Sequence, residues 1–392
     1  MRKLHIINLE KMGGVERLFL QYIQDDSAQN DAIFCISNHI GPEIVQHLSN
    51  RKIIFVNRLS NKVSIKYPAF LRKYVLQLKL LLAQPEAIIV WDLVPNLLAK
   101  PNRSKIIYYD HGCSWRYQHN KKTLRFFSML SGVISAAWAS KRVMEIRFNL
   151  PCPVNVVINR ILPPRDIFTG MKTPLTSVRL GIAARQVGLK GISVALQTLR
   201  VLLDRGMNVT LDIAGKGPDE EKFKALSHKL GIADRVRFIG FQQDLSNFFN
   251  HIHIYISTPV TEPFGLSCME ALHYGVPVVF PLIDGQPEVV KDGYCGIGIV
   301  PDILPEVHWQ QTGIDVDFPH YVYYPKEDKL LPPKLLSPEA CADAIEKIAG
   351  PDYERYRANA FTHVKTHFDH KNFVSDFNKN IDGIINAQTR NH

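Results

Sequence analysis

Two hydrophobic periods alternate along most of the chain. Short apolar runs, among them residues 4–8, 178–184, 209–214 and 276–280, are typical of buried strands. Between these runs lie segments whose apolar residues recur every three to four positions, as in amphipathic helices. Strands that alternate with helices over the whole length predict an α/β fold with parallel sheets.

The length of the chain predicts two domains. At 392 residues and 46% hydrophobic content, it exceeds what a single hydrophobic core usually serves. The periodicity is interrupted between residues 159 and 174, where two consecutive prolines and a glycine occur. We therefore expect one domain at residues 1–165 and a second at residues 166–370, followed by a terminal helical segment at residues 371–392.

Two carboxylates, Glu262 and Glu270, are eight residues apart across a Pro-Phe-Gly break that opens a short apolar helix. Glu262 is expected on the loop that leaves the preceding strand, and Glu270 about one turn inside the helix, so both would face one crevice. The amides of Phe264, Gly265 and Leu266 would suit a phosphate, because the first amides of a helix lack intrahelical acceptors. These groups together suit a sugar nucleotide. An ordinary capped helix with two surface acids would show the same spacing.

A second group of charges follows the run at residues 178–184. Arg185 comes first, and Lys190 and Gly191 precede an apolar-periodic helix. A planar guanidinium and a flexible ammonium on one strand-to-helix loop could together bind both phosphates of a nucleotide diphosphate. The alternative is a solvated pair of surface cations.

In order and spacing, these charges match the R-x4-K and E-x7-E motifs, and the chain resembles the retaining GT-B glycosyltransferases of the large family four (glycosyl transferases group 1). The resemblance extends to a G-x-G turn at residues 215–217, a strand that ends at Gly240, and the loop at residues 284–293, so it covers roughly residues 178–300. Lys216 departs from the acid that is common at its position, and we assign it no role.

The resemblance implies two Rossmann-like domains whose parallel sheets face a central cleft. The first domain would bind the acceptor and the second the nucleotide sugar, while residues 371–392 would form a helix that packs back on the first domain. The implied reaction transfers a sugar from a UDP- or GDP-linked donor to a glycan or glycolipid acceptor, with retention and without a metal or other cofactor. Glu262 would orient the donor sugar, and Glu270 would bind the ribose.

The N-terminal half contributes two further candidates. Gly13 and Gly14 follow the first strand, and glycines at such a turn let a ligand approach the backbone closely. By resemblance, this pair faces the phosphates of the donor. His111 follows the strand at residues 105–109, where ligands bind in open α/β sheets, and it resembles a histidine that contacts the donor sugar. A tight turn and a histidine with ordinary polar contacts are the alternatives.

The charge of the chain is concentrated in the N-terminal half. Residues 1–165 contain 24 Lys and Arg against 10 Asp and Glu, whereas the remainder has a net charge of −4. Residues 67–82 predict an apolar helix that carries Arg72, Lys73 and Lys79, and residues 115–127 interleave basic and aromatic side chains. Both segments suit an anionic membrane surface or an anionic glycolipid. A core helix with a solvated basic face would also fit. No nucleic-acid partner is expected, because no recognised nucleic-acid module accompanies the positive charge.

The remaining features concern location and function class. No signal peptide and no apolar run of the ~18–20 residues that span a membrane are apparent. Six cysteines, at positions 35, 113, 152, 268, 295 and 341, form no C-x-x-C pair and indicate reduced thiols. We therefore expect a cytoplasmic enzyme. The basic face and the family resemblance imply that it associates peripherally with the inner face of the cytoplasmic membrane, in bacterial lipopolysaccharide or other surface polysaccharide synthesis.

Two other function classes stay open. A nucleotide-sugar epimerase of the same fold would also bind a diphosphate, and a noncatalytic carbohydrate- or membrane-binding protein is a further alternative.

Residues 301–336 form a longer connection than the family usually has, and they are rich in aromatic residues. They could stack on a ligand or simply fill space.

Overall fold

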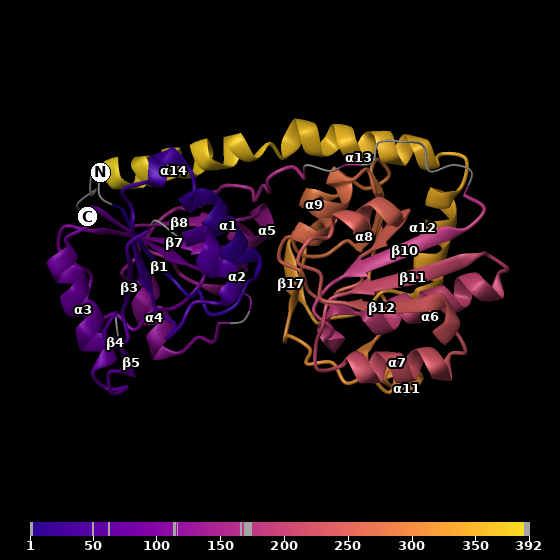
Figure 1. The fold of residues 1–392 in the computed structure, drawn as a ribbon, viewed down its shortest axis with the longest axis horizontal. Coiled ribbons are helices and arrows are strands. Elements are labelled where there is room, and N and C mark those ends of the chain that lie inside the picture. The colour runs from indigo at the N-terminus through magenta and orange to yellow at the C-terminus, as the bar shows by residue number, and fades with distance from the viewer. Residues whose placement is uncertain are drawn as a thin grey trace. The chain divides into compact units, whose positions relative to one another are not determined.

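The computed structural model describes residues 3–48, 51–61, 63–112, 115, 117–164, 167 and 175–387. The chain forms two compact units, which Figure 1 shows as ribbons. Unit 1 comprises Met1–Arg160 and His370–His392, and unit 2 comprises Ile161–Asp369. Residues 165 and 166, between which the sequence placed the domain boundary, lie outside the described residues.

Unit 1 is built on a seven-stranded parallel sheet with the order β3-β2-β1-β6-β7-β8-β9. The strand order reverses between β1 and β6, and the apolar strand residues are buried on both faces, as expected for a doubly wound sheet. The elements are β1 Lys3–Ile7, α1 Gly14–Ile23, β2 Ala32–Cys35, α2 Pro42–Val45, β3 Ile53–Phe55, the hairpin strands β4 Arg58–Ser60 and β5 Val63–Lys66, α3 Arg72–Ala83, β6 Ala87–Trp91, β7 Lys105–Asp110, α4 Lys121–Phe127, β8 Gly132–Ser135, α5 Trp138–Arg147 and β9 Val154–Val156.

The last helix of the chain, α14 (His370–Asn386), belongs to unit 1. Its Phe377 ring is 5.1 Å from the ring of Tyr22, and 5.4 Å from each of the rings of Trp91 and Tyr109. These aromatic contacts join the end of the chain to α1, β6 and β7. The helix therefore completes the core of the first unit.

Unit 2 contains a six-stranded parallel sheet with the order β12-β11-β10-β13-β14-β15. Because parallel crossovers are right-handed, a reversal of strand order puts the connecting helices on opposite faces of the sheet. Figure 1 shows helices on both sides of this sheet. The elements are β10 Val178–Ala183, α6 Ile192–Asp204, β11 Val209–Ala214, α7 Glu220–Lys229, β12 Val236–Gly240, α8 Ser246–His251, β13 Ile254–Ile256, α9 Leu266–His273, β14 Val278–Pro281, α10 Gln286–Val289, β15 Gly296–Ile299, α12 Pro338–Ala349 and α13 Tyr353–His367.

Residues 301–336 are a packed part of unit 2. They contain α11 (Pro305–Thr312) and the antiparallel pair β16 (Val322–Tyr324) and β17 (Lys329–Leu331). His308 of α11 is buried, and its Nε2 is 2.8 Å from the Ser193 hydroxyl of α6. A β-bridge between Ile303 and Leu335 closes the segment on itself.

The structure corrects two expectations about the basic region of unit 1. The helix expected at residues 67–82 begins only at Arg72. Lys79 does not belong to a solvated basic face, because its ammonium donates to the carbonyls of Phe55 and Val56 at 2.9 and 3.2 Å. Within residues 115–127, Lys121–Phe127 form helix α4, and Arg116 lies outside the described residues.

The described cysteines are free thiols at positions 35, 152, 268, 295 and 341. Cys113 lies outside the described residues. Among the helices in the described ranges, none is both long and apolar enough to cross a membrane.

Candidate functional site

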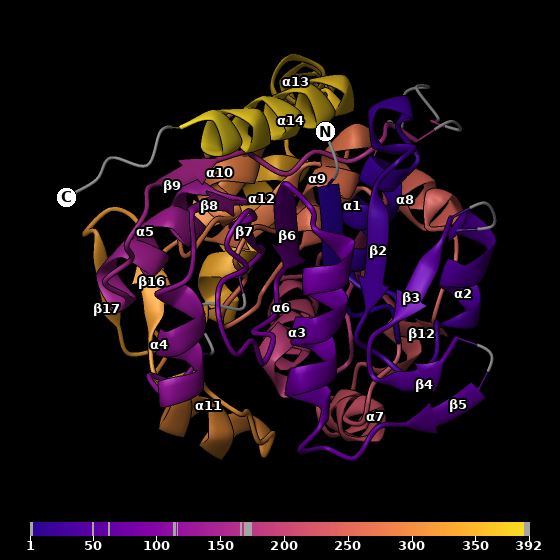
Figure 2. The same cartoon turned by 90° about the vertical axis from the view of Figure 1, so that its left-hand side faces the viewer.

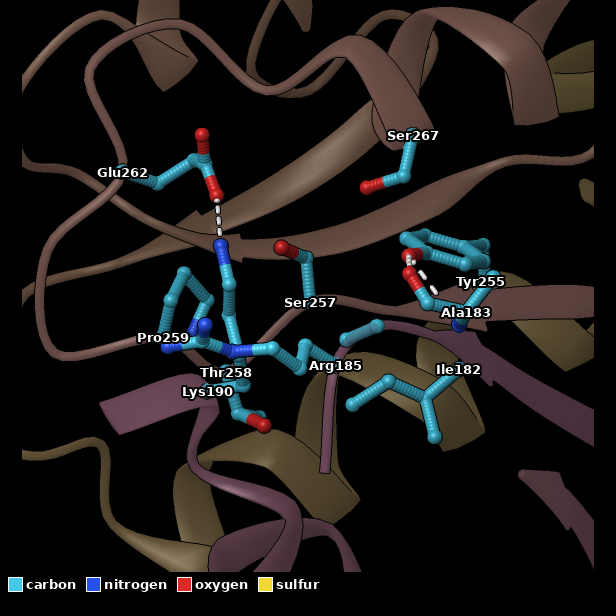
Figure 3. A pocket seen from close by; sticks show the side chains of 11 residues that line it. Ile182, Ala183, Arg185, Lys190, Tyr255, Ser257, Thr258, Pro259, Glu262 and Ser267 are labelled. Carbon is cyan, nitrogen blue, oxygen red and sulfur yellow. Dashed lines mark hydrogen bonds and ion pairs between the residues drawn. The ribbon is translucent and has the colours of Figure 1, made fainter. Parts of the chain in front are cut away.

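A pocket of about 160 Å³ lies in unit 2 at the carboxyl ends of β10 and β13. These neighbouring strands flank the point where the strand order reverses, and open α/β sheets bind ligands at such a switch point. Three of the charged residues that the sequence singled out, Arg185, Lys190 and Glu262, line this pocket (Figure 3). The structure thus brings together groups that are up to 77 positions apart in the sequence.

The loop that carries Lys190 is fixed by a close backbone contact. Gly191 has φ +64°, and a β-carbon at this position would lie 1.8 Å from the carbonyl oxygen of Thr258. The Thr258 hydroxyl donates to the Gly191 carbonyl at 2.8 Å. Only glycine fits both constraints, so this contact ties the start of α6 to the loop after β13. Lys190 is therefore held beside the residues that lead to Glu262.

The loop that carries Arg185 is supported from the other side by the G-x-G turn. Gly215 has φ +119°, and a β-carbon there would lie 2.0 Å from the carbonyl oxygen of Ala184. The side-chain amide of Gln186 donates to the Gly215 carbonyl at 2.8 Å, and the Gln186 amide N–H donates to the carbonyl of Lys216 at 3.1 Å. These contacts hold the backbone on both sides of Arg185, whose side chain is exposed.

Glu262 is fixed by contacts to its side chain and its backbone. The Lys190 ammonium lies 2.5 Å from Glu262 Oε2, and both side chains are partly exposed (Figure 3). The Glu262 amide donates to Asp284 Oδ2 at 2.9 Å, and the hydroxyl of Thr261 donates to the same oxygen at 2.7 Å. Asp284 is fully buried, and its Oδ1 accepts the amide of Tyr323 at 3.0 Å. Asp284 thus joins the Glu262 loop to β16.

Helix α9 begins where the sequence placed it. Gly265 caps the helix with φ +99°, and its carbonyl accepts the first helical bonds, at 3.0 and 3.2 Å. Leu266 is the first helical residue, and the Phe264 ring just before it is buried. Glu270 is half-buried one turn further along α9, whereas Glu262 lines the pocket itself.

Sequence reasoning missed several uncharged polar residues of the pocket. Ser257 and Thr258 follow β13, and Ser267 lies in the first turn of α9. The Tyr255 hydroxyl both donates to the Ala183 carbonyl, at 3.1 Å, and accepts its amide, at 3.2 Å. The position of Ser257 and Thr258 directly after a strand beside the switch point could have identified them as pocket residues. They supply hydroxyl groups beside the charged residues.

A thiol beside the pocket is not prepared to act as a nucleophile. Cys268 of α9 is fully buried, and burial raises its pKa to about 12. It therefore stays protonated at neutral pH, and the thiolate is the reactive form of cysteine.

The N-terminal candidates lie in unit 1. Gly13 caps α1 in an extended conformation, and Gly14 is the first residue of that helix. Glu16 in the same turn is half-buried, and burial raises the pKa of its carboxyl. His111 follows β7, and its amide donates to Asp92 Oδ1 at 2.9 Å at the end of β6. The glycine turn and His111 therefore lie at carboxyl ends of strands in the same sheet.

Comparison with known proteins finds similar sequences and similar structures. Residues 172–306 match the family model of glycosyl transferases group 1. A D-inositol 3-phosphate glycosyltransferase of Streptomyces griseus is 33% identical over 153 residues, which are 36% of this chain and 32% of that protein. The chain thus matches about a third of the length of the first curated relatives.

Similar solved structures extend over both units. The Anabaena protein HepE, determined with UDP and glucose, has a TM-score of 0.70 at 17% identity over 98% of this chain and all of that one. WaaG, a glycosyltransferase involved in lipopolysaccharide biosynthesis, has a TM-score of 0.66 at 15% identity over 99% of this chain and all of that one. The chain has the GT-B fold, and residues 172–306 within it are similar to the glycosyl transferases group 1.

Proposed function

We propose that unit 2 binds a nucleotide diphosphate sugar and that the protein transfers the sugar, with retention, to a glycan or glycolipid acceptor. The observation that carries this proposal is the convergence of Arg185, Lys190 and Glu262 in one pocket at the switch point of the sheet. The structure of HepE with UDP and glucose supports a nucleotide sugar as the donor. UDP and GDP are both candidates for the nucleotide.

The charges of the pocket suit departure of a diphosphate. Negative charge grows on the leaving phosphate as the glycosidic bond breaks, and fixed cations that face this charge lower the barrier. Arg185 offers a planar fork of N–H donors. The ammonium of Lys190 has three donors, so it can keep one on Glu262 and direct the others at phosphate oxygens.

In this proposal Glu262 orients the donor sugar. Its carboxylate is held by Lys190, and its backbone is held by Asp284. A group fixed in this way keeps the sugar near its reactive geometry without reorganisation. Glu270 would bind the ribose, and the amides around Gly265 would contact the phosphates. Gly13, Gly14 and His111 are proposed to contribute to the donor site from unit 1.

The cellular setting is a further part of the proposal. The similarity to WaaG supports a role in lipopolysaccharide or another surface polysaccharide, made at the inner face of the cytoplasmic membrane. A peripheral enzyme at an anionic membrane would meet a glycolipid acceptor there. The net positive charge of residues 1–165 supports this location.

Thermal-shift measurements over a panel of UDP-, GDP-, ADP- and TDP-linked sugars test the donor site. Arg185→Ala should weaken binding of the selected nucleotide about 10- to 100-fold, because each charge-assisted contact contributes about 1.5–3 kcal/mol. Arg179→Ala is the matched control, since Arg179 is exposed at the opposite end of β10. Equal affinities in these two variants would remove the phosphate contact from the proposal.

Incubation with the selected donor alone tests the type of reaction. A transferase should release nucleotide slowly by hydrolysis, and it should transfer the sugar when a lipid-linked acceptor is added. Formation of an epimerised nucleotide sugar would instead identify an epimerase. The anomeric configuration of the transferred sugar, read by NMR, decides between retention and inversion.

A further inference from the structure

Helix α3 in unit 1 presents an apolar stripe to solvent. Tyr74, Leu78, Leu81 and Leu82 are spaced as one face of a helix, and their side chains are 53%, 57%, 51% and 76% exposed. Phe70, just before the helix, is 69% exposed. Single exposed leucines are ordinary, but a contiguous apolar patch on a helix marks an interaction surface.

The stripe is not needed to hold α3 in place. Leu76 and Leu80 form the inner face of the helix, where they are buried in the core of unit 1. Lys79 further anchors α3 through the carbonyls of Phe55 and Val56. The helix is therefore apolar on two faces, and only the inner face is occupied by the unit itself.

The hairpin that precedes α3 adds a second exposed apolar element. Leu59, Val63 and Ile65 of β4 and β5 are 50%, 43% and 60% exposed. Figure 2 faces the side of unit 1 on which α3, β4 and β5 all lie in front. Both elements thus carry exposed apolar residues, and both elements lie on this side of the unit.

The charge around these elements favours one class of partner. Residues 44–85 contain no Asp or Glu but carry eight Lys and Arg. Several of these cations bond to neutral carbonyls instead of acids: Arg72 donates to Tyr67 O at 2.9 Å, and Arg58 Nε donates to Asn38 O at 2.7 Å. Their positive charge is therefore not neutralised locally. A second copy of this surface would bring like charges together, whereas anionic lipid headgroups would neutralise them.

We propose that α3 and the β4–β5 hairpin form a membrane-insertion surface that anchors the protein on an anionic bilayer. The stripe of Phe70, Tyr74, Leu78, Leu81 and Leu82 enters the boundary between headgroups and acyl chains, and the surrounding cations contact the headgroups. This inference rests on the proposed membrane location and specifies its mechanism. Attachment depends mainly on apolar insertion, with electrostatic attraction in support.

Sedimentation with vesicles tests the surface, using phosphatidylcholine with and without about 30% phosphatidylglycerol. Leu78→Ser combined with Leu82→Ser should lower vesicle affinity at least about tenfold, because two exposed leucines no longer insert. Lys66→Ser combined with Lys73→Ser should lower affinity for anionic vesicles only. In about 0.5 M salt the wild-type protein should keep part of its binding, since insertion is not screened.

The matched control is Leu304→Ser combined with Phe241→Ser, which removes two exposed apolar side chains from unit 2. It should bind vesicles as the wild type does. The circular dichroism spectrum and the nucleotide affinity should be unchanged in all three double variants. A variant that loses vesicle binding but keeps its nucleotide affinity has lost the anchor and not the donor site. Equal vesicle binding by the Leu78/Leu82 variant and the wild type would overturn the proposal. The proposal would also be overturned if the wild type bound no vesicles and was a dimer, while the Leu78/Leu82 variant was a monomer.

Discussion

The buried carboxylate of Asp284 is expected to control the position of Glu262. Its two oxygens accept the backbone amides of Glu262 and Tyr323 and the hydroxyl of Thr261, at 2.7–3.0 Å. Its backbone is left-handed, with φ 49°, and its side chain is fully buried. A non-glycine residue keeps such a conformation only when its surroundings stabilise it. Asp284 therefore couples the pocket to residues 301–336.

The substitution Asp284→Asn keeps the size of the side chain but not its two acceptors. An amide group offers one oxygen, so its NH2 must face either the Glu262 amide or the Tyr323 amide. A buried donor left without an acceptor costs about 1–3 kcal/mol, and loss of the charge weakens the remaining bonds. We expect unit 2 to lose about 2–4 kcal/mol of stability.

The same substitution should impair turnover more than donor binding. The Glu262 loop would shift, and a displacement of about 1 Å can cost about 100-fold in rate. Arg185 and Lys190 lie on a different loop, so nucleotide affinity should change little. Steady-state kinetics, calorimetric unfolding and hydrogen exchange at the amides of Glu262 and Tyr323 measure the three effects.

The control for this experiment is Asp302→Asn, which alters an exposed acid in residues 301–336, the segment that Asp284 contacts. Its stability, exchange rates and turnover should match those of the wild type. If Asp284→Asn also behaves like the wild type, or if it loses nucleotide affinity as strongly as turnover, the coupling argued from these hydrogen bonds is wrong.

Further predictions concern the pocket and the packing of unit 2. Lys190→Ala should weaken nucleotide binding about 10- to 100-fold, and unchanged affinity in titration calorimetry would contradict its role. Glu262→Gln can still accept the Lys190 ammonium, so affinity should be retained while turnover falls; wild-type turnover would count against the assignment. Gly191→Ala places a β-carbon against a carbonyl oxygen and should destabilise unit 2 by about 2 kcal/mol or more, measured by urea unfolding, with loss of nucleotide binding. Burial lowers the pKa of His273 and of His308 from 6.5 to about 4. Below pH 6.5 the unfolded chain therefore binds protons that the folded chain does not, and stability should fall between pH 6.5 and 4 by up to about 3 kcal/mol for each histidine. His308→Gln should flatten this pH dependence in calorimetry, and an unchanged slope would refute it.

The sequence alone determined the fold class and the local elements that carry the candidate site. Alternating apolar runs and helical periods predicted parallel sheets, because burial on both faces requires continuous apolar strands. The spacing of Arg185, Lys190, Glu262 and Glu270 indicated a donor site through a family resemblance. The family match and the GT-B fold agree with the resemblance, and the donor site stays a prediction. These are local patterns, which a sequence records directly.

Contacts between distant residues were decided only by the tertiary structure. No local pattern predicts that Lys190 lies 2.5 Å from Glu262, or that Asp284 holds both the Glu262 loop and β16. The helix expected at residues 67–82 shows the same limit. The sequence showed that it carries both basic and apolar residues, but not which of them are buried. The packing of α3 decided that Lys79 faces Phe55 while Leu78 and Leu82 face solvent. Which face of a helix is buried depends on what packs against it, and that partner is set by the fold of the whole unit.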